Sequence, residues 1–174
     1  MSLSLHQASV GAFQATMTPF LAILAKAAAH AEAAKFDPAV YATLRLRPNM
    51  LAFPRQVQIF CDQAKNSTAR LAAIEPPRYE DNETTLDDLK GRIEKTLAFI
   101  GAADRSAVEA GAEREIVFPL GPNKARMIGR DYLVHYVLPN YYFHLTTAYD
   151  LLRQAGVDIG KRDFLGQPPG LTLI

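Results

Sequence analysis

The sequence is poor in the residue types that most often carry metal and redox chemistry. It has one cysteine, no tryptophan and four histidines among 174 residues. A single cysteine excludes an intramolecular disulfide and any zinc finger built on several thiolates. A histidine-based metal site would therefore have to draw on His6, His30, His135 and His144.

The chain also lacks an excess of charge of either sign. Its 19 basic and 18 acidic side chains leave a net charge of +1 at pH 7. Nucleic-acid-binding domains usually carry a clear basic excess, so the composition argues against a nucleic-acid partner. No uninterrupted apolar run approaches the ~18–20 residues of a membrane span, and residues 1–6 lack the pattern of a signal peptide. We therefore expect a cytoplasmic protein that has no membrane partner.

Residues that favour β-strands are scarce as well. The sequence holds 8 Val and 9 Ile against 27 Ala and 20 Leu. Alanine and leucine are strong helix formers, whereas the β-branched residues favour strands. The length fits about one domain, and we expect residues 1–174 to form a single, mainly helical one.

Apolar residues recur at helical spacing in four long segments. In the first of them they follow one another in steps of three and four from Val10 to Ala31. The predicted helices cover residues 3–34, about 49 or 54 to 74, 85–101 and 130–154. A Thr85-x-x-Asp88 capping box opens the third, and Asp37-Pro38 predicts a short extra turn. Four such stripes bury themselves best against one another, which predicts an all-α, up-down four-helix bundle.

One stretch before the last helix resembles a pair of strands. Residues 115–118 and 125–128 flank a Gly-Pro-Asn-containing segment, residues 120–124, which predicts a small β-hairpin with a five-residue loop. Two strands alone are marginally stable, so the hairpin must pack against the helices. The tail, residues 157–174, is rich in glycine and proline, and we expect it to be irregular. Its Arg162 and Asp163 could brace the tail against the bundle or bind an anion.

The last helix interrupts its own apolar stripe with two polar residues. Asn140 and His144 are four residues apart and therefore lie on one face, one turn from each other. Pro139 cannot donate to the carbonyl of His135, so this carbonyl should lie free at the same level. Tyr141 lies in the same stretch. Gln56 and Gln58 flank the stripe of the second long helix and could reach inward.

Two interpretations of this cluster stay open. In the first, a structural network pairs His144 with Asn140, a tyrosine hydroxyl or a glutamine of the second helix, because buried polar groups must be paired. In the second, the cluster lines a polar pocket made by Asn140, His144, Tyr141, His135, Gln56 and Gln58. His144 would then be a ligand-binding group, a general base or a metal ligand. Cys61 lies close to an apolar stripe and is expected to act as a small hydrophobe.

Several motifs carry a resemblance to a known family. They are the stretch from Leu138-Pro139-Asn140 to Tyr149, Gly160-Lys161-Arg162-Asp163-Phe164-Leu165-Gly166, Phe36-Asp37-Pro38 and Arg55-Gln56-Val57-Gln58-Ile59, with the opening Ser2-Leu3-Ser4-Leu5. Over essentially its whole length the chain resembles an uncharacterised bacterial domain-of-unknown-function family among the DinB/YfiT-like four-helix bundles.

This resemblance implies a metal site that the chain lacks the residues to build. Related bundles often hold a divalent metal on three histidines, one from the second helix and two in an H-x-x-x-H pair on the last. Here the pair is Asn140-x-x-x-His144, and the second helix offers only Gln56, Gln58 and Cys61. One imidazole with amide oxygens is a poor donor set for zinc or nickel. We therefore predict no cofactor, with His144 as the weak candidate for a metal ligand.

The resulting functional expectation is a binding protein. We expect a polar pocket between the second and fourth long helices that binds a small ligand and is a degenerate metal site. We also expect a homodimer, because related bundles often pair. The alternatives are a divalent-metal- or thiol-dependent S-transferase or isomerase that uses His144, and a structural homodimer without a ligand.

Overall fold

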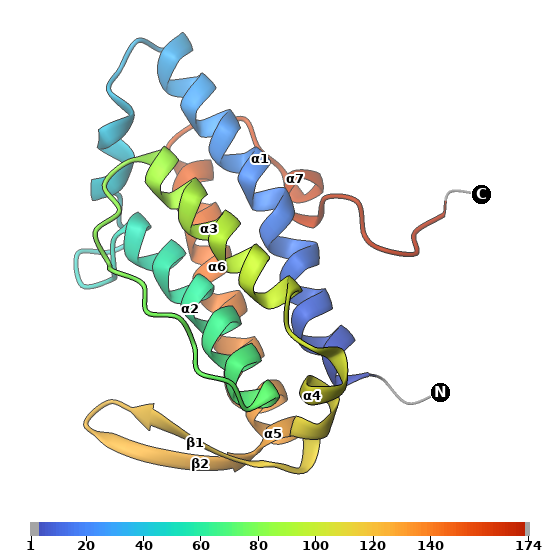
Figure 1. Ribbon diagram of the computed structural model, residues 1–174. Helices are drawn as coiled ribbons and strands as arrows, with labels where there is room; N and C mark the ends of the chain where they lie inside the picture. Colours follow the sequence, from blue (N-terminus) through green and yellow to red (C-terminus); the bar gives the residue numbers. More distant parts are fainter. Residues whose placement is uncertain (1–3, 173–174) are drawn as a thin grey trace.

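Four apolar stripes meet in one core, as the sequence predicts (Figure 1). The structure is a computed structural model and describes residues 4–172. The long helices are α1 (Ala12–Ala33), α2 (Phe53–Ala72), α3 (Leu86–Gly101) and α6 (Leu138–Gln154). Buried apolar side chains from Val10 to Ile159 form the shared core. The predicted four-helix bundle is confirmed, and so is the hairpin before the last long helix.

α1 is the most apolar of the helices. With the preceding π-helical turn η1 (Gln7–Gly11) it is 27 residues long and reaches a mean hydropathy of 1.4, enough by length and composition to cross a membrane. In this fold it serves as a core helix, because Phe13, Met17 and Phe20 are buried in the bundle. Only 39% of its most apolar window is buried, however, and its outer face is rich in exposed alanine.

The local signals at the helix ends act as expected. Asp37 caps the short 3₁₀ helix η2 (Pro38–Thr43) by accepting the N–H of Ala39 at 2.9 Å. At the start of α3, Thr85 and Asp88 form the predicted capping box. α2 ends two residues before the expected position, because Ala73 takes a left-handed conformation with φ of 56°.

The connection between α2 and α3, residues 73–84, runs along the length of the bundle (Figure 1). It returns the chain from the end of α2 to the level of its start, so Arg55 meets Asp81 and Asp62 meets Arg92. A 20-residue helix such as α2 is about 30 Å long. The connection, residues 73–84, reaches roughly 40 Å when extended, at about 3.3–3.6 Å per residue, and can therefore span the full length of α2. α2 and α3 therefore run in the same direction, where a strict up-down alternation would make them antiparallel.

A short helical and β-sheet segment closes one end of the bundle. It comprises α4 (Arg105–Glu109), the 3₁₀ helix η3 (Ala110–Glu113) and the antiparallel strands β1 (Glu115–Leu120) and β2 (Asn123–Ile128). The turn between the strands holds only Gly121 and Pro122, so the predicted five-residue loop is wrong. The shorter turn is possible because Gly121 takes a φ of 57°, as tight hairpin turns require. Phe118 packs on Tyr132, with ring centroids 4.8 Å apart, and thereby ties the hairpin to the bundle.

The last long helix is preceded by an irregular stretch of helix. α5 (Gly129–Asp131) and the π-helical turn η4 (Tyr132–Val137) lead directly into α6, which ends at Gln154 as predicted. Pro139 lies at the junction of η4 and α6, inside one unbroken helical stretch from Gly129 to Gln154, where it cannot donate a backbone hydrogen bond.

The tail is less irregular than the sequence predicts. Residues Lys161–Leu165 form a short helix, α7, because the Asp163 carboxylate accepts the N–H of Gly160 at 2.8 Å. The same carboxylate binds Lys26 of α1 at 2.7 Å. Of the two expected roles for this segment, the structure shows bracing of the tail.

Three backbone segments approach one another closely at the hairpin end. A Cβ atom on Gly129 would lie 1.9 Å from the carbonyl oxygen of Gly111, and a Cβ on Gly111 would lie 2.3 Å from that of Leu71. Both positions are buried. The end of α2, η3 and α5 can therefore meet only where these two residues have no side chain.

We expect Gly129→Ala to lower the free energy of unfolding by about 1–3 kcal/mol or more, since backbone atoms must move. Gly91→Ala is the matched control, because Gly91 is exposed in α3 and its Cβ would meet nothing within 4 Å. That control should stabilise the helix by up to ~1 kcal/mol. Urea unfolding of the two variants checks this, and equal effects would contradict the close approach.

Candidate functional site

The structure pairs His144 of α6 with Gln56 of α2. The Nδ1 atom of His144 lies 2.6 Å from the Oε1 atom of Gln56. Gln56 is buried at 1% exposure, whereas His144 is half-buried. A glutamine of the second helix is one of the partners that the sequence predicts for this histidine.

The hydrogen bonds around Gln56 fix the proton on the imidazole. The Nε2 atom of Gln56 donates to the carbonyl oxygen of Leu51 at 3.0 Å, which turns its Oε1 toward His144. An amide oxygen only accepts, so the Nδ1 of His144 must carry the hydrogen. The neutral ring then has its lone pair on Nε2.

This Nε2 atom is the reactive end of the pair. Among residues 4–172 this Nε2 atom has no hydrogen-bond partner. The buried polar atoms that lack a partner do not include it, so it is exposed to solvent. Burial of the ring and then the positive charge of Arg55 lower the pKa of His144 below 6.5. At neutral pH the pair therefore presents a hydrogen-bond acceptor that can also take a proton.

The remaining predicted residues of the last helix do not join this pair. Asn140 is half-buried and makes no side-chain hydrogen bond to any described residue. Tyr141 is fully buried, and its hydroxyl lies 2.7 Å from that of Thr16 on α1. His135 is exposed.

Gln58 belongs to a different cluster. Its Nε2 atom donates to Glu83 at 2.9 Å, and its Oε1 accepts from Arg55 at 2.8 Å. The expected pocket thus divides in two on α2: Gln56 faces α6, while Gln58 faces the 73–84 connection.

An arginine that is fully buried holds this second cluster together. Arg92 of α3 binds Glu83 at 2.9 Å, Asp62 at 3.0 Å and Asp81 at 3.0 Å. Burial alone would raise the pKa of the Glu83 carboxyl, but hydrogen bonds from Arg92 and Gln58 outweigh it and hold that pKa below 4.5. The cluster joins α2, α3 and the connection between them.

Tyr79 of the connection lies among the cations of the same cluster. The ammonium groups of Lys65 and Lys95 lie 4.2 and 4.3 Å from the centre of its ring, which is cation–π geometry. The sequence holds one signal for this cluster: the spacing of Leu89, Arg92, Thr96 and Ile100, which places Arg92 on the inner face of α3.

The other chemically versatile side chains are engaged in the fold. Cys61 is fully buried, and burial raises the pKa of its thiol to about 12, so it is a small hydrophobe and no nucleophile at neutral pH. His30 is half-buried, and its Nδ1 lies 2.7 Å from the hydroxyl of Tyr41.

The donor groups do not fit a zinc or nickel ion. No group of three His, Cys, Asp or Glu side chains that could hold a metal occurs within residues 4–172. Gln56 touches the Nδ1 side of His144, and therefore lies behind the ring rather than beside the free Nε2. Gln56 is a positioning residue for the imidazole and no substitute for a missing ligand.

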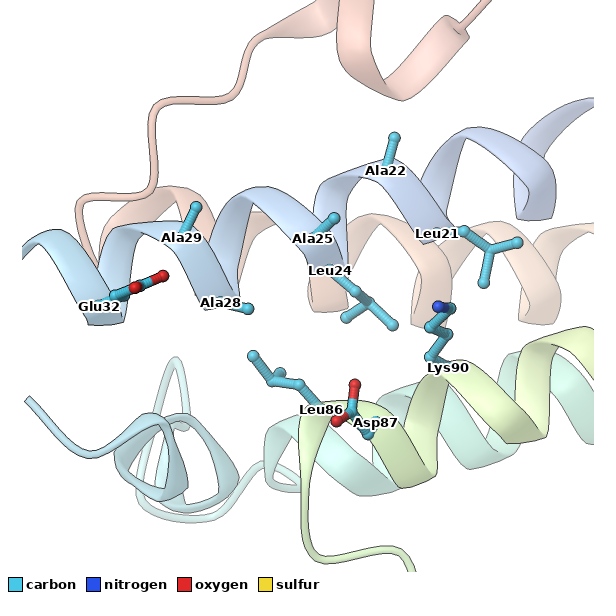
Figure 2. Close-up of a pocket in the computed structure, with 10 residues that line it drawn as sticks. All are labelled: Leu21, Ala22, Leu24, Ala25, Ala28, Ala29, Glu32, Leu86, Asp87 and Lys90. Carbon is cyan, nitrogen blue, oxygen red and sulfur yellow. The ribbon is translucent and has the colours of Figure 1, made fainter.

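A groove of about 590 Å³ lies elsewhere, between α1 and α3 (Figure 2). Its lining is mostly apolar: Leu21, Ala22, Leu24, Ala25, Ala28, Ala29, Glu32, Leu86, Asp87 and Lys90. Figure 2 shows Glu32 at one end of the groove and Lys90 near the other.

The arrangement of helices and hairpin defines a DinB-like helical bundle. A crystal structure of a DinB family member protein from Shewanella denitrificans is similar to it, with a TM-score of 0.89 and 35% identity over 97% of this chain and 96% of that one. The chain belongs to the family described as a domain of unknown function (DUF1993), which matches residues 5–165. No curated protein matches it.

The cluster around Arg92 makes stability depend on acid pH. A carboxyl whose pKa is depressed by folding adds stability above its unfolded pKa, and this stability is lost as the pH falls through the folded value. We expect Glu83→Gln to cost about 1–3 kcal/mol near pH 7 and to flatten the loss of stability below about pH 4.5.

Glu94→Gln is the control for this prediction. Glu94 is exposed on the same helix, 3.9 Å from Lys90, so the change should stay within about 0.5 kcal/mol. Denaturant unfolding measured between pH 3 and 7 separates the two variants. Parallel pH profiles for Glu83→Gln and the wild type would contradict the assignment.

Proposed function

We propose that this protein binds a small ligand at His144 without using a metal. The observation that carries the proposal is the chain of hydrogen bonds from Leu51 through Gln56 to His144, which leaves a bare imidazole nitrogen at the surface. The buried Gln56 holds the ring in one orientation, which is what a binding group requires.

The His144 site lies at the surface of the bundle, whereas the sequence predicts a pocket between the helices. The groove between α1 and α3 does not include His144, and Tyr141, Val57 and Phe60 of the same two helices, α6 and α2, are fully buried in the core. A ligand would therefore cover the site from outside rather than enter the bundle. The weak metal candidate and the S-transferase alternative both depend on the same Nε2 atom, so one set of variants tests all three.

We expect purified protein to contain no stoichiometric zinc or nickel, and metal content to be unaffected by His144→Ala. Elemental analysis checks this. Compounds found by a thermal-shift screen should lose affinity in His144→Ala and retain it in His135→Ala, the matched exposed histidine of the same helix.

Affinity must be measured by calorimetry, because His144→Ala leaves the buried oxygen of Gln56 unpaired and costs about 1–3 kcal/mol of stability. A stoichiometric metal that disappears in His144→Ala would contradict the metal-free proposal and favour the transferase. A screen whose every hit binds His144→Ala equally well would contradict ligand binding at this site.

We also propose that a second copy of the chain docks in the α1–α3 groove. Leu21, Leu24 and Leu86 give it an apolar lining, and the alanines of α1 allow another helix to approach closely. The ends of the groove carry opposite charges, on Glu32 and Lys90 (Figure 2). A two-fold axis across the groove would bring Glu32 opposite the partner's Lys90, which makes the surface self-complementary.

We expect a dimer by sedimentation equilibrium that Ala25→Arg dissociates, since a guanidinium would stand in the groove. Ala102→Arg, an exposed alanine just after α3, is the control. Glu32→Lys and Lys90→Glu should each weaken the dimer, and the double variant should restore it. A monomeric wild type at ~100 µM, well above ordinary dimer affinities, would end the proposal.

A further inference from the structure

The polar atom that the His144 site offers to a ligand only accepts hydrogen bonds. Because Nδ1 carries the hydrogen and binds Gln56, the exposed Nε2 has a lone pair and no proton. A carboxylate, which is itself an acceptor, would face this lone pair and be repelled. A hydroxyl or N–H group would find the partner it needs.

Two exposed apolar residues contact the His144–Gln56 pair. Phe143 is 57% exposed, and its ring centre lies 5.1 Å from that of His144, edge to face. Leu51, whose carbonyl holds Gln56 in place, exposes 43% of its side chain. In small-molecule sites apolar area gives affinity and a fixed polar atom gives orientation, and both elements are present at this surface.

The cation that acts on His144 is Arg55, and it is engaged by other residues. Arg55 is close enough to lower the pKa of His144, but its guanidinium binds Asp81 and Gln58. Asp81, which also binds Arg92, and Gln58 hold its Nη1 atom toward the 73–84 connection. The cation that acts on the site is therefore already paired with a carboxylate.

We propose that the His144 site selects neutral, flat apolar molecules that carry one hydroxyl or N–H donor, the chemical class of phenols and azoles. The donor binds Nε2 of His144, and the ring of the ligand covers Phe143 and Leu51. This inference rests on the proposed function and names its ligand class. Since the site is open to solvent, simple members of the class bind weakly, and substituents that extend over Phe143 improve them.

The experiment uses three probes of similar shape: phenol, anisole and benzoate. Protein with ¹⁵N-labelled histidine is titrated with each at pH 7.5, and the ring nitrogens are followed by NMR. Before any probe is added, the spectrum must show His144 with its proton on Nδ1. Phenol should shift the Nε2 signal saturably, whereas anisole, which lacks the donor, should bind at least about fivefold more weakly. Benzoate should bind more weakly than phenol.

Two variants test the parts of the site separately. Phe143→Ala should weaken phenol severalfold while leaving the Nδ1–H form of His144 unchanged, because Phe143 makes only ring contacts. His135→Ala should leave the titration unchanged. Backbone amide spectra establish that each variant is folded before its affinity is compared.

The outcomes separate this inference from the proposed function. Benzoate or anisole binding at His144 as well as phenol would overturn the ligand class while leaving small-ligand binding in place. A proton on Nε2 in the free protein, or a phenol shift that Phe143→Ala does not weaken, would also overturn the class. Failure of the broader screen at His144 would overturn the proposed function as well.

Discussion

The buried guanidinium of Arg92 is the constraint on which the arrangement of the bundle depends. A charge without access to water is strongly unfavourable unless anionic partners surround it, and here they come from two segments: Asp62 on α2, and Asp81 and Glu83 in the long connection. Meeting that requirement holds the connection along the bundle. The connection in turn allows α2 and α3 to be parallel neighbours.

The same turn of α2 serves both the ionic cluster and the candidate site. Arg55 and Gln58 face the connection, whereas Gln56 faces α6 and holds His144. Any shift of this turn would change the hydrogen bond that sets which imidazole nitrogen is bare. The chemistry of the site therefore depends on electrostatics on the opposite side of the helix.

Local signals in the sequence were sufficient for the helices and much less so for the site. The apolar stripes, the Thr85–Asp88 capping box and the end of α6 at Gln154 depend on neighbours within a few residues, and the structure has them as predicted. Gln56 was identified as a candidate because its position beside the stripe allows it to reach inward. Gln58 could not be assigned to its cluster in advance, since Glu83 and Arg92 reach it only once the connection is folded. The α7 helix could not be predicted for a similar reason. Asp163, which caps α7, is held by Lys26 of α1, a residue far away in the sequence.

The π-helical turn η4 lets one continuous helix present two differently oriented faces. A π-turn contains one residue more than an α-turn, and each residue turns a helix by about 100°. Tyr132 and Tyr136 before the junction face the hairpin through Phe118, whereas Tyr141 and His144 after it face α1 and α2. The extra residue therefore rotates the part of the helix after η4 by a fixed angle relative to the part before it. The number of residues in this turn therefore sets which face of the helix carries His144 relative to the hairpin.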